Sequence, residues 1–423
     1  MAVHVFTGFG FGPIQSGLFV NEAFKSGSFS RIVIAEVDQR LVDAVRANKG
    51  SYYVNVARKD RVDIVRIDGI EIFNPTVDAD RAKLVEALRE STEIVTSLPS
   101  VKFFDNGTET SVAALIAAGL KDSMAKATII YTAENNNHAA EALQEAVSRR
   151  IAVDTKKVQF LNTVIGKMSQ VVVDAGQIAE QKLERMVPGI DRAFLVEEFN
   201  HILVTRCKLE GFRPGITVFS EKDDLLPFEE AKLYGHNAIH ALLAYLGATK
   251  GYKTMTQLKD DTAIMKIGRD AFINESGAAL IKKYSHLGDE LFTVAGFKSY
   301  AEDLLERMTN PYLDDAIERA GRDPLRKLSY DDRIFGTMAL ALQYGIAPEN
   351  MAFGALAGIG VLLKQAEINK LPESLRFDSA NLDSKKIAAI ANWLWSAKTG
   401  QYADKMIACM EKCLPCFKSR LGC

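Results

Sequence analysis

Residues 3–17, VHVFTGFGFGPIQSG, decide the fold of the first half of this chain. A β-type run (3–9) leads into a G-x-G turn at Gly10 and Gly12, and the following segment (14–27) has helical character and ends on a glycine. Such a turn lets the backbone approach a pyrophosphate, and the helix N-terminus offers unpaired N–H groups to the anion. An ordinary glycine-rich loop is the alternative, because Gln15 stands where the usual fingerprint has its third glycine.

An acidic residue after the second strand-like run supports the first interpretation. The run RIVIAEVD (31–38) places Glu36 at its end. A carboxylate there can accept hydrogen bonds from the ribose hydroxyls, and it would repel a 2′-phosphate. The strand, the turn, the helix and the acid together predict a dinucleotide site with NAD as the cofactor.

The rest of the chain divides into two patterns. Strand-like runs at 93–98, 126–135 and 157–166 alternate with helical segments, which is typical of a parallel sheet covered on both faces. Segments 52–57 and 62–73 predict a small antiparallel insertion. Beyond a last strand-like run at 192–205, apolar residues recur at helical spacing. We therefore expect an α/β fold: a Rossmann-type parallel-sheet domain over 1–205, followed by an all-α domain over 206–423.

Bulk composition excludes several classes of partner. The 423 residues include 52 Lys+Arg and 54 Asp+Glu, for a net charge of −2, so no general attraction to nucleic acid or to an anionic membrane is expected. The longest apolar stretch, 351–363, is shorter than the ~20 residues that cross a bilayer. The first residues lack the basic and apolar regions of a signal peptide. A cytoplasmic enzyme without nucleic-acid or membrane partners is the expectation, and no pattern points to an oligomeric state.

Five cysteines leave two interpretations open. Four of them, Cys409, Cys413, Cys416 and Cys423, lie near the C-terminus, and Cys207 stands alone. The spacing of the group is compatible with a thiolate metal site or a redox pair, whereas reduced thiols in a terminal helix are the plainer alternative.

Polar side chains gather at the start of an otherwise apolar helical segment, AKLYGHNAIHALLAYLG (231–247). At about 100° per residue, with Lys232 at 0°, Glu229 falls near 60°, His240 near 80° and Asn237 near 140°. The four can therefore point into one cavity. A desolvated lysine can act as a base for an alcohol, and amide and imidazole groups can hold the developing oxyanion. Taken singly, Lys232 could be a solvated lysine and His240 a core histidine.

Two other dehydrogenase chemistries lack their residues. None of the twelve tyrosines has a lysine four positions later, as short-chain dehydrogenases require. The six histidines and five cysteines give no convincing catalytic zinc set. We therefore expect a metal-independent, lysine-assisted hydride transfer.

At this point the motifs resemble one family. KLYGHNAIH (232–240) is similar to the Lys-x4-Asn-x2-His signature of the polyol-specific long-chain dehydrogenases, the mannitol dehydrogenase family. Further segments share the likeness along most of the chain: FGFGPIQSG (9–17), AEVD (35–38), TAEN (132–135), VEEF (196–199), ESGAALIKKY (275–284) and NPYLDDAIERAGRDPLRKLSYDDR (310–333).

The resemblance implies a substrate cleft between the two domains and no required metal. It implies Lys232 as general acid/base, Asn135 and Asn237 as the pair that holds the oxyanion, His240 as a hydrogen-bond donor to substrate, and Glu229 near a proton-exit path. The expected cofactor contacts are Gly10, Gly12, Ile14, Gln15, Glu36, Thr96, Ser97 and Asn135.

The sequence departs from the family at two places. Gly166 and Lys167 stand where the family often has Asp-Arg, so an aspartate that conducts protons is missing. Ser16 stands where phosphate-specific relatives have an arginine.

A cationic segment follows residue 318. It carries Arg319, Arg322, Arg326 and Lys327, which could recognise a substrate phosphate or carboxylate, and Arg322 and Arg326 are the chosen candidates. The alternative is that the cations of 318–328 brace the structure by pairing with nearby carboxylates, namely Asp314, Asp315, Asp323 and Asp331.

The expected function is NAD-dependent interconversion of D-mannitol 1-phosphate and D-fructose 6-phosphate. Two alternatives stay open. One keeps the chemistry but uses a free polyol or a hexuronate, such as fructuronate or tagaturonate. The other is a nucleotide-binding protein without catalytic activity.

Overall fold

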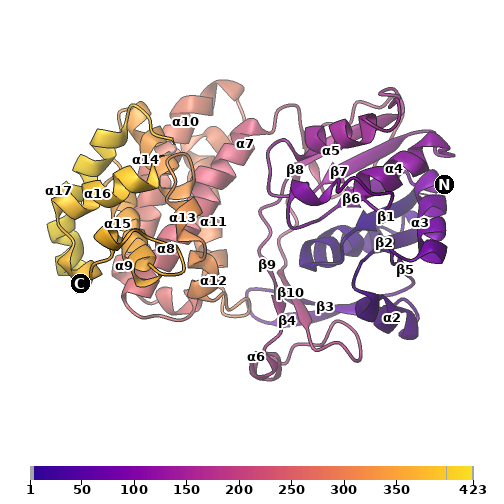
Figure 1. Ribbon diagram of the computed structural model, residues 1–423, viewed down its shortest axis with the longest axis horizontal. Helices are drawn as coiled ribbons and strands as arrows, with labels where there is room; N and C mark the ends of the chain where they lie inside the picture. The colour runs from indigo at the N-terminus through magenta and orange to yellow at the C-terminus, as the bar shows by residue number, and fades with distance from the viewer. Residues whose placement is uncertain (1–3, 397, 422–423) are drawn as a thin grey trace. The chain divides into compact units, whose positions relative to one another are not determined.

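The chain forms two compact units that divide between Leu226 and Pro227. The computed structural model describes residues 4–396 and 398–421, and Figure 1 labels its helices and strands. The boundary expected after residue 205 falls inside the first unit, between β11 (Leu203–Thr205) and β12 (Ser220–Lys222). These two strands pair in parallel. Residues 206–219, which connect them, therefore belong to the first unit.

The larger sheet of the first unit has eight strands, in the order β12-β11-β8-β7-β6-β1-β2-β5. Neighbours from β8 to β5 are parallel, and β11 runs antiparallel to β8. When the six parallel strands are numbered along the chain, their order across the sheet is 3-2-1-4-5-6, as in a dinucleotide-binding Rossmann fold. This confirms the predicted parallel-sheet domain. The parallel strands are β1 (His4–Phe9), β2 (Phe29–Ala35), β5 (Glu71–Phe73), β6 (Glu93–Thr96), β7 (Thr128–Thr132) and β8 (Val158–Val164).

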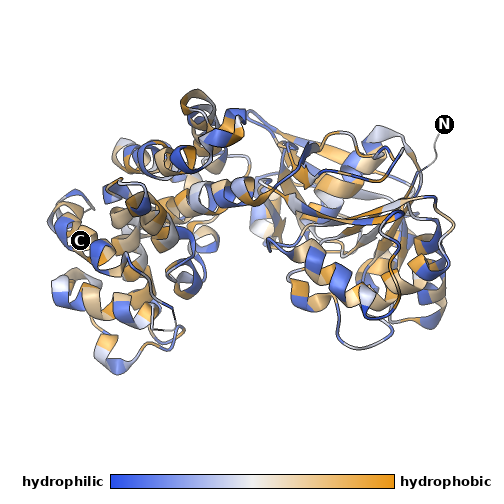
Figure 2. Cartoon of the chain, turned by 90° about the horizontal axis from the view of Figure 1, so that it is seen from above, coloured by the Kyte–Doolittle hydropathy of each residue, from blue (hydrophilic) through white to orange (hydrophobic). Residues whose placement is uncertain are grey.

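Both faces of this sheet are buried. On β2, the neighbours Val33 and Ile34 point to opposite faces, and each is fully buried in a separate hydrophobic cluster. Figure 2 shows hydrophobic residues along the strands of this unit. One face packs against α2 and the first helix, which consists of a π-helical segment (Gln15–Val20) continued by α1. The other face packs against α3 to α5. The helices are α1 (Asn21–Ser26), α2 (Gln39–Ala47), α3 (Asp78–Glu90), α4 (Val112–Lys121) and α5 (Ala139–Ser148).

A smaller sheet, in the order β4-β3-β10-β9, lies beside the larger one. Strands β3 and β4 form the predicted antiparallel insertion, whereas β5, expected within it, pairs with β2 in the larger sheet. The run at 192–205, expected as one strand, is two strands: β10 joins the smaller sheet and β11 the larger. The bounds are β3 (Tyr52–Ala57), β4 (Val62–Ile67), β9 (Ser169–Val172), α6 (Ala175–Glu180) and β10 (Ala193–Glu197).

The second unit is helical, as predicted: within 227–396 and 398–421 every named element is a helix. Short 3₁₀ turns join several of them. The main helices are α7 (Leu226–Glu230), α8 (Ala238–Thr249), α9 (Thr262–Asp270), α10 (Ala278–Tyr284), α11 (Val294–Met308), α12 (Ile317–Gly321), α13 (Pro324–Lys327), α14 (Arg333–Gln343), α15 (Glu349–Lys364), α16 (Ser384–Leu394) and α17 (Ala403–Leu421).

The core of this unit is the contact between α8 and α15. A methyl group at Gly354 would lie 2.8 Å from Leu242, and one at Gly358 would lie 2.9 Å from Tyr245. The two glycines of α15 therefore let the helices approach closely. This packing buries the apolar stretch 351–363, and no helix among the described residues is long and apolar enough to cross a membrane.

The terminal cysteines pack α17 against the start of α15. The Sγ atoms of Cys409 and Cys413 lie 3.6 Å and 3.7 Å from the carbonyl oxygens of Pro348 and Glu349. Cys423 lies outside the described residues. Among 4–396 and 398–421, no three His, Cys, Asp or Glu side chains are placed to hold a metal ion.

Candidate active site

The glycine-rich turn follows β1 beside the end of β6, the point where the strand order of the sheet reverses. Gly10 has a φ of +85°, which favours glycine, and its N–H donates to the carbonyl of Ala35 at 2.9 Å. A methyl group at Gly10 would lie 2.7 Å from the carbonyl oxygen of Ser97. Gly10 thus lets the turns after β1, β2 and β6 converge at the edge of the sheet where a dinucleotide binds in this fold.

The missing third glycine is compensated elsewhere. A methyl group at Gly8 of β1 would lie 1.7 Å from the buried amide of Gln15, so Gly8 makes the room that Gln15 fills. A methyl group at Gly17 would lie 2.6 Å from Val196, so Gly17 allows the close approach of the first helix to β10. The sequence interpretation missed both glycines, because it placed close helix–strand packing at one fixed position.

Gly12 and Glu36 complete the surroundings of this turn. No atom lies within 4 Å of a methyl group built at Gly12, so this part of the turn is open. Oε1 of Glu36 accepts the N–H groups of Val37 and Asp38, at 2.8 Å and 2.9 Å, which fixes the carboxylate at the end of β2. Ile14 packs at the margin of the core and opens the helix. A strained glycine, an open glycine and an oriented carboxylate fit the pyrophosphate and ribose of a dinucleotide.

A buried carboxyl group organises the next two strand ends. Glu134 is 4% exposed, its Oε2 accepts the hydroxyl of Thr96 at 2.9 Å, and its Oε1 accepts the N–H of Leu98 at 2.8 Å. Burial raises the pKa of Glu134 to about 7. Thr96 therefore uses its hydroxyl to join β6 to the segment after β7. The backbone of Ser97 and the exposed side chain of Asn135 lie at the carboxyl ends of these strands.

The signature lysine lies on a π-helical turn. Residues Ala231–Asn237 form π-helix between α7 and α8, in one continuous helix. The expectation of 100° per residue is therefore wrong across this segment. In a π turn the hydrogen bonds run from i to i+5, so residues five apart lie above one another. Asn237 is five residues after Lys232, and the π turn brings it nearer to the face of Lys232 than an α-helix would.

Side chains from two other helices support this turn. The hydroxyl of Ser276 donates to the carbonyl oxygen of Tyr234 at 2.7 Å. Oγ1 of Thr337 lies 3.1 Å from the same oxygen and 2.5 Å from the carbonyl oxygen of Arg333, and its single hydrogen can serve only one of the two at a time. Ser276 belongs to a second π-helical segment, Ala271–Gly277, so the turn is held by residues of two other helices.

Lys232 has the electrostatics of a base near neutral pH. Its side chain is half-buried. Burial and, to a lesser extent, the positive charge of Arg333 lower the pKa of Lys232 to about 8, against the opposing effect of the Glu229 carboxylate. Arg333, which the sequence interpretation did not single out, is therefore part of the environment of the amine.

A buried carboxylate faces the signature histidine. Nε2 of His240 lies 3.1 Å from Oδ2 of Asp315, and Nε of Arg319 donates to Oδ1 of Asp315 at 2.6 Å. Burial raises the pKa of Asp315, but the contacts with His240 and Arg319 outweigh it and lower the pKa to about 2. Burial also lowers the pKa of the neighbouring His236 well below its ordinary value.

Arg322 and Arg326, the two predicted anion-binding arginines, are exposed, whereas two neighbouring cations are buried. Arg326 pairs with Asp323 at 2.6 Å on the surface, and Arg322 is exposed. The pairings Arg326–Asp323 and Arg319–Asp315 are two of those that the bracing alternative expects, and Arg322 takes part in neither. Lys327 and Arg333 are instead buried, with exposed fractions of 7% and 8%.

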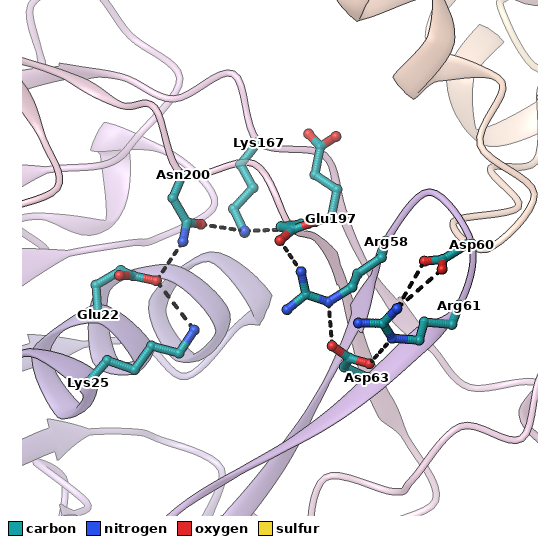
Figure 3. A network of polar contacts seen from close by, with 10 residues as sticks. Glu22, Lys25, Arg58, Asp60, Arg61, Asp63, Lys167, Glu197 and Asn200 are labelled. Carbon is teal, nitrogen blue, oxygen red and sulfur yellow. Dashed lines mark hydrogen bonds and ion pairs between the residues drawn. The ribbon is translucent and has the colours of Figure 1, made fainter.

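Lys167, at one of the departures from the family, is a structural clamp in the first unit. Its buried Nζ donates to Oδ1 of Asn200 at 2.7 Å and to the carbonyl groups of Glu197 and Phe199 (Figure 3). Asn200 in turn donates to Oε1 of Glu22 in α1 at 2.6 Å. The pair Gly166-Lys167 thus holds the chain after β10 and supplies no carboxylate for proton transfer.

Known proteins resemble this chain in both units. Residues 224–366 match the family model of the mannitol dehydrogenase C-terminal domain, and the match begins close to Pro227, the start of the second unit. Mannitol-1-phosphate 5-dehydrogenase of Buchnera aphidicola subsp. Acyrthosiphon pisum (strain Tuc7) is 29% identical over 357 residues, which are 82% of this chain and 84% of the relative. The second unit thus carries a mannitol dehydrogenase C-terminal domain, and most of the chain is similar to oxidoreductases named mannitol-1-phosphate 5-dehydrogenase.

Solved structures share the fold. A D-sorbitol dehydrogenase in substrate-free form matches with a TM-score of 0.76 at 14% identity, covering 100% of this chain and 94% of the other. Pseudomonas fluorescens mannitol 2-dehydrogenase, in a ternary complex with NAD and D-mannitol, matches with a TM-score of 0.67 at 16% identity and the same coverage. Both agree with a mannitol dehydrogenase fold of a parallel-sheet unit followed by a helical unit.

Proposed function

We propose that this protein is a member of the mannitol dehydrogenase family and interconverts D-mannitol 1-phosphate and D-fructose 6-phosphate, with NAD as its cofactor. The observation that carries the chemistry is Lys232, a half-buried amine with a pKa of about 8 on a π turn of the family signature. The phosphate is supported by the relatives, which are named mannitol-1-phosphate 5-dehydrogenases. NAD rather than NADP is supported by the carboxylate of Glu36 after β2.

In this proposal each polar side chain of the site has one task. Lys232, as the free amine, takes the proton of the substrate hydroxyl during oxidation and returns it during reduction. Asn237 and Asn135 donate hydrogen bonds to the oxygen as it changes between hydroxyl and carbonyl. His240 binds a neighbouring hydroxyl, and Glu229 lies by the amine as an acceptor for its proton. A bound NAD supplies the acceptor for the hydride.

The test is reduction of NAD⁺ measured with D-mannitol 1-phosphate, D-mannitol and D-mannonate, and the reverse reaction with D-fructose 6-phosphate and D-fructuronate. We expect the phosphate pair to give the highest kcat/KM. Lys232→Ala should lower it by about 10²–10⁴-fold, the usual contribution of a positioned general base. Lys266→Ala, at an exposed lysine of α9, is the control and should change neither rate nor stability.

The free polyol is the second candidate, because the structural neighbours are named for sorbitol and mannitol. Faster turnover of D-mannitol than of its phosphate would overturn the proposed substrate and keep the chemistry. NADH binding without turnover of any of these compounds, unchanged in Lys232→Ala, would instead indicate a nucleotide-binding protein without catalytic activity.

A further inference from the structure

The amine of Lys327 is buried without a carboxylate partner. Lys327 ends α13, and its Nζ donates to the carbonyl oxygen of Ala320. No Asp or Glu of residues 4–396 and 398–421 lies within ion-pair distance of this amine. A buried ammonium group is costly unless an anion pairs with it. The ammonium form of Lys327 could therefore pair with an anion that is not part of the described chain.

The surrounding charges are also mostly positive. The guanidinium of Arg333 is buried beside Lys327 and pairs with Asp332 at 2.6 Å. Burial, followed by the charges of Arg333, Arg326 and Arg322, lowers the pKa of Lys327 to about 7, and the carboxylate of Asp323 opposes this effect. A buried amine held among guanidinium groups is an electrostatic environment that favours the arrival of an anion.

A buried hydroxyl without a partner reaches the same region. Tyr245 lies on α8, on the helix that carries Lys232, and its Oη is fully buried with no hydrogen-bond partner. Its ring packs against Gly321 and Gly358, and the nearby charges are the two guanidinium groups of Arg333 and Arg326 and the two carboxylates of Asp323 and Asp332. A buried hydroxyl normally has a partner, so this one is a second, independent indication of a missing acceptor.

We propose that Lys327 and Arg333, with the hydroxyl of Tyr245, form the site that binds the phosphate of the polyol or ketose substrate. This inference rests on the proposed function. A phosphate offers the oxygen acceptors that an ammonium, a guanidinium and a phenol require. The exposed Arg322 and Arg326, the candidates expected from the sequence, form the rim of the site and attract the dianion, while the buried pair binds it.

Substrate preference tests this assignment. We define the preference as kcat/KM for D-mannitol 1-phosphate divided by kcat/KM for D-mannitol. Lys327→Met removes one charged hydrogen bond to the phosphate and should lower the preference by about 10- to 100-fold. Arg333→Gln should lower it similarly, and Arg333→Lys should restore part of it. The control Lys266→Met also loses one charge from the second unit and should leave the preference unchanged.

A direct binding measurement separates the site from the reaction. Inorganic phosphate is titrated calorimetrically into the NADH complexes of the native protein and the variants, after thermal unfolding has shown that each is folded. We expect phosphate binding to weaken by about tenfold or more in Lys327→Met and to be unchanged in Lys266→Met.

The outcomes distinguish this site from the proposed function. If no polyol phosphate is oxidised but phosphate binding still depends on Lys327, the function fails and the site stands. If D-mannitol 1-phosphate is the substrate but Lys327→Met and Arg333→Gln keep both the preference and phosphate binding, the function stands and the site is wrong. A hexuronate preferred over the phosphate, with phosphate binding unaffected by Lys327→Met, would also overturn the site.

Discussion

Nε2 of His240 lies 3.1 Å from Oδ2 of Asp315, a carboxylate only 1% exposed. Arg319 fixes the other oxygen of this carboxylate at 2.6 Å. In the proposed mechanism, Nδ1 is then the ring nitrogen that binds the substrate, and Asp315 acts through His240 as a positioning residue. Asp315 comes from a segment 75 positions away along the chain.

Removing the charge of Asp315 should impair orientation of the histidine. We expect Asp315→Asn to lower kcat/KM for polyol oxidation by about 10- to 100-fold, the scale of a buried polar contact with a charged group. NADH affinity, measured by fluorescence titration, should not change, because Asp315 belongs to the second unit and the glycine-rich turn to the first. Asp270→Asn, at a surface carboxylate paired with Lys266, is the control for loss of one charge. Equal effects of the two variants would remove Asp315 from the mechanism.

Gly12 and Gly10 should separate cofactor binding from folding. A methyl group at Gly12 meets no protein atom within 4 Å, so Gly12→Ala should leave the midpoint of thermal unfolding unchanged or slightly higher. The same methyl group would crowd a bound pyrophosphate and should weaken NADH binding about 10- to 100-fold, which corresponds to about 1.4–2.8 kcal/mol.

Gly10→Ala should behave differently, because its φ is +85° and its methyl group would lie 2.7 Å from the carbonyl oxygen of Ser97. We expect a loss of stability of about 1–3 kcal/mol by denaturant unfolding. Tight NADH binding by a stable Gly12→Ala protein would show that the cofactor does not approach this turn.

Much of the fold could be predicted from local patterns. Strand–helix alternation and the G-x-G turn indicated a Rossmann-type sheet, and helical spacing indicated the second unit, because both signals come from residues close in sequence. The Lys232, Asn237 and His240 set was likewise visible as one motif. The π turn was not, since the rotation per residue was assumed from an α-helix and the turn depends on hydroxyls of Ser276 and Thr337 from other helices.

The residues that escaped prediction act through tertiary contacts. Gly8 matters because Gln15 lies over it, and Asp315 matters because it faces His240. Lys327 was recognisable as one cation of a run of mixed charges, but the sequence did not show that it is buried while its neighbours Arg322 and Arg326 are exposed. No local pattern encodes these three relationships.

The pKa of Lys232 predicts the pH dependence of both directions. Oxidation needs the free amine, so kcat/KM for the polyol should rise with pH and level off above about 8; reduction needs the ammonium form and should fall over the same range. The charge of Arg333 lowers the pKa of Lys232. Arg333→Gln should therefore move both profiles to higher pH. Profiles recorded between pH 6 and pH 10 check this, and an unmoved or downward-shifted profile in Arg333→Gln would contradict the link between the two residues.

Glu36 should set the choice between the two nicotinamide dinucleotides. Its carboxylate is fixed at the end of β2 by the N–H groups of Val37 and Asp38. A 2′-phosphate at that place would meet a like charge, which costs several kcal/mol. Glu36→Gln keeps the shape and removes the charge, so the ratio of kcat/KM for NADP to that for NAD should rise at least about tenfold. Asp43→Asn, on the exposed face of α2, loses the same charge nearby and should leave the ratio unchanged. A native protein that already uses NADP as well as NAD would show that Glu36 does not face the ribose.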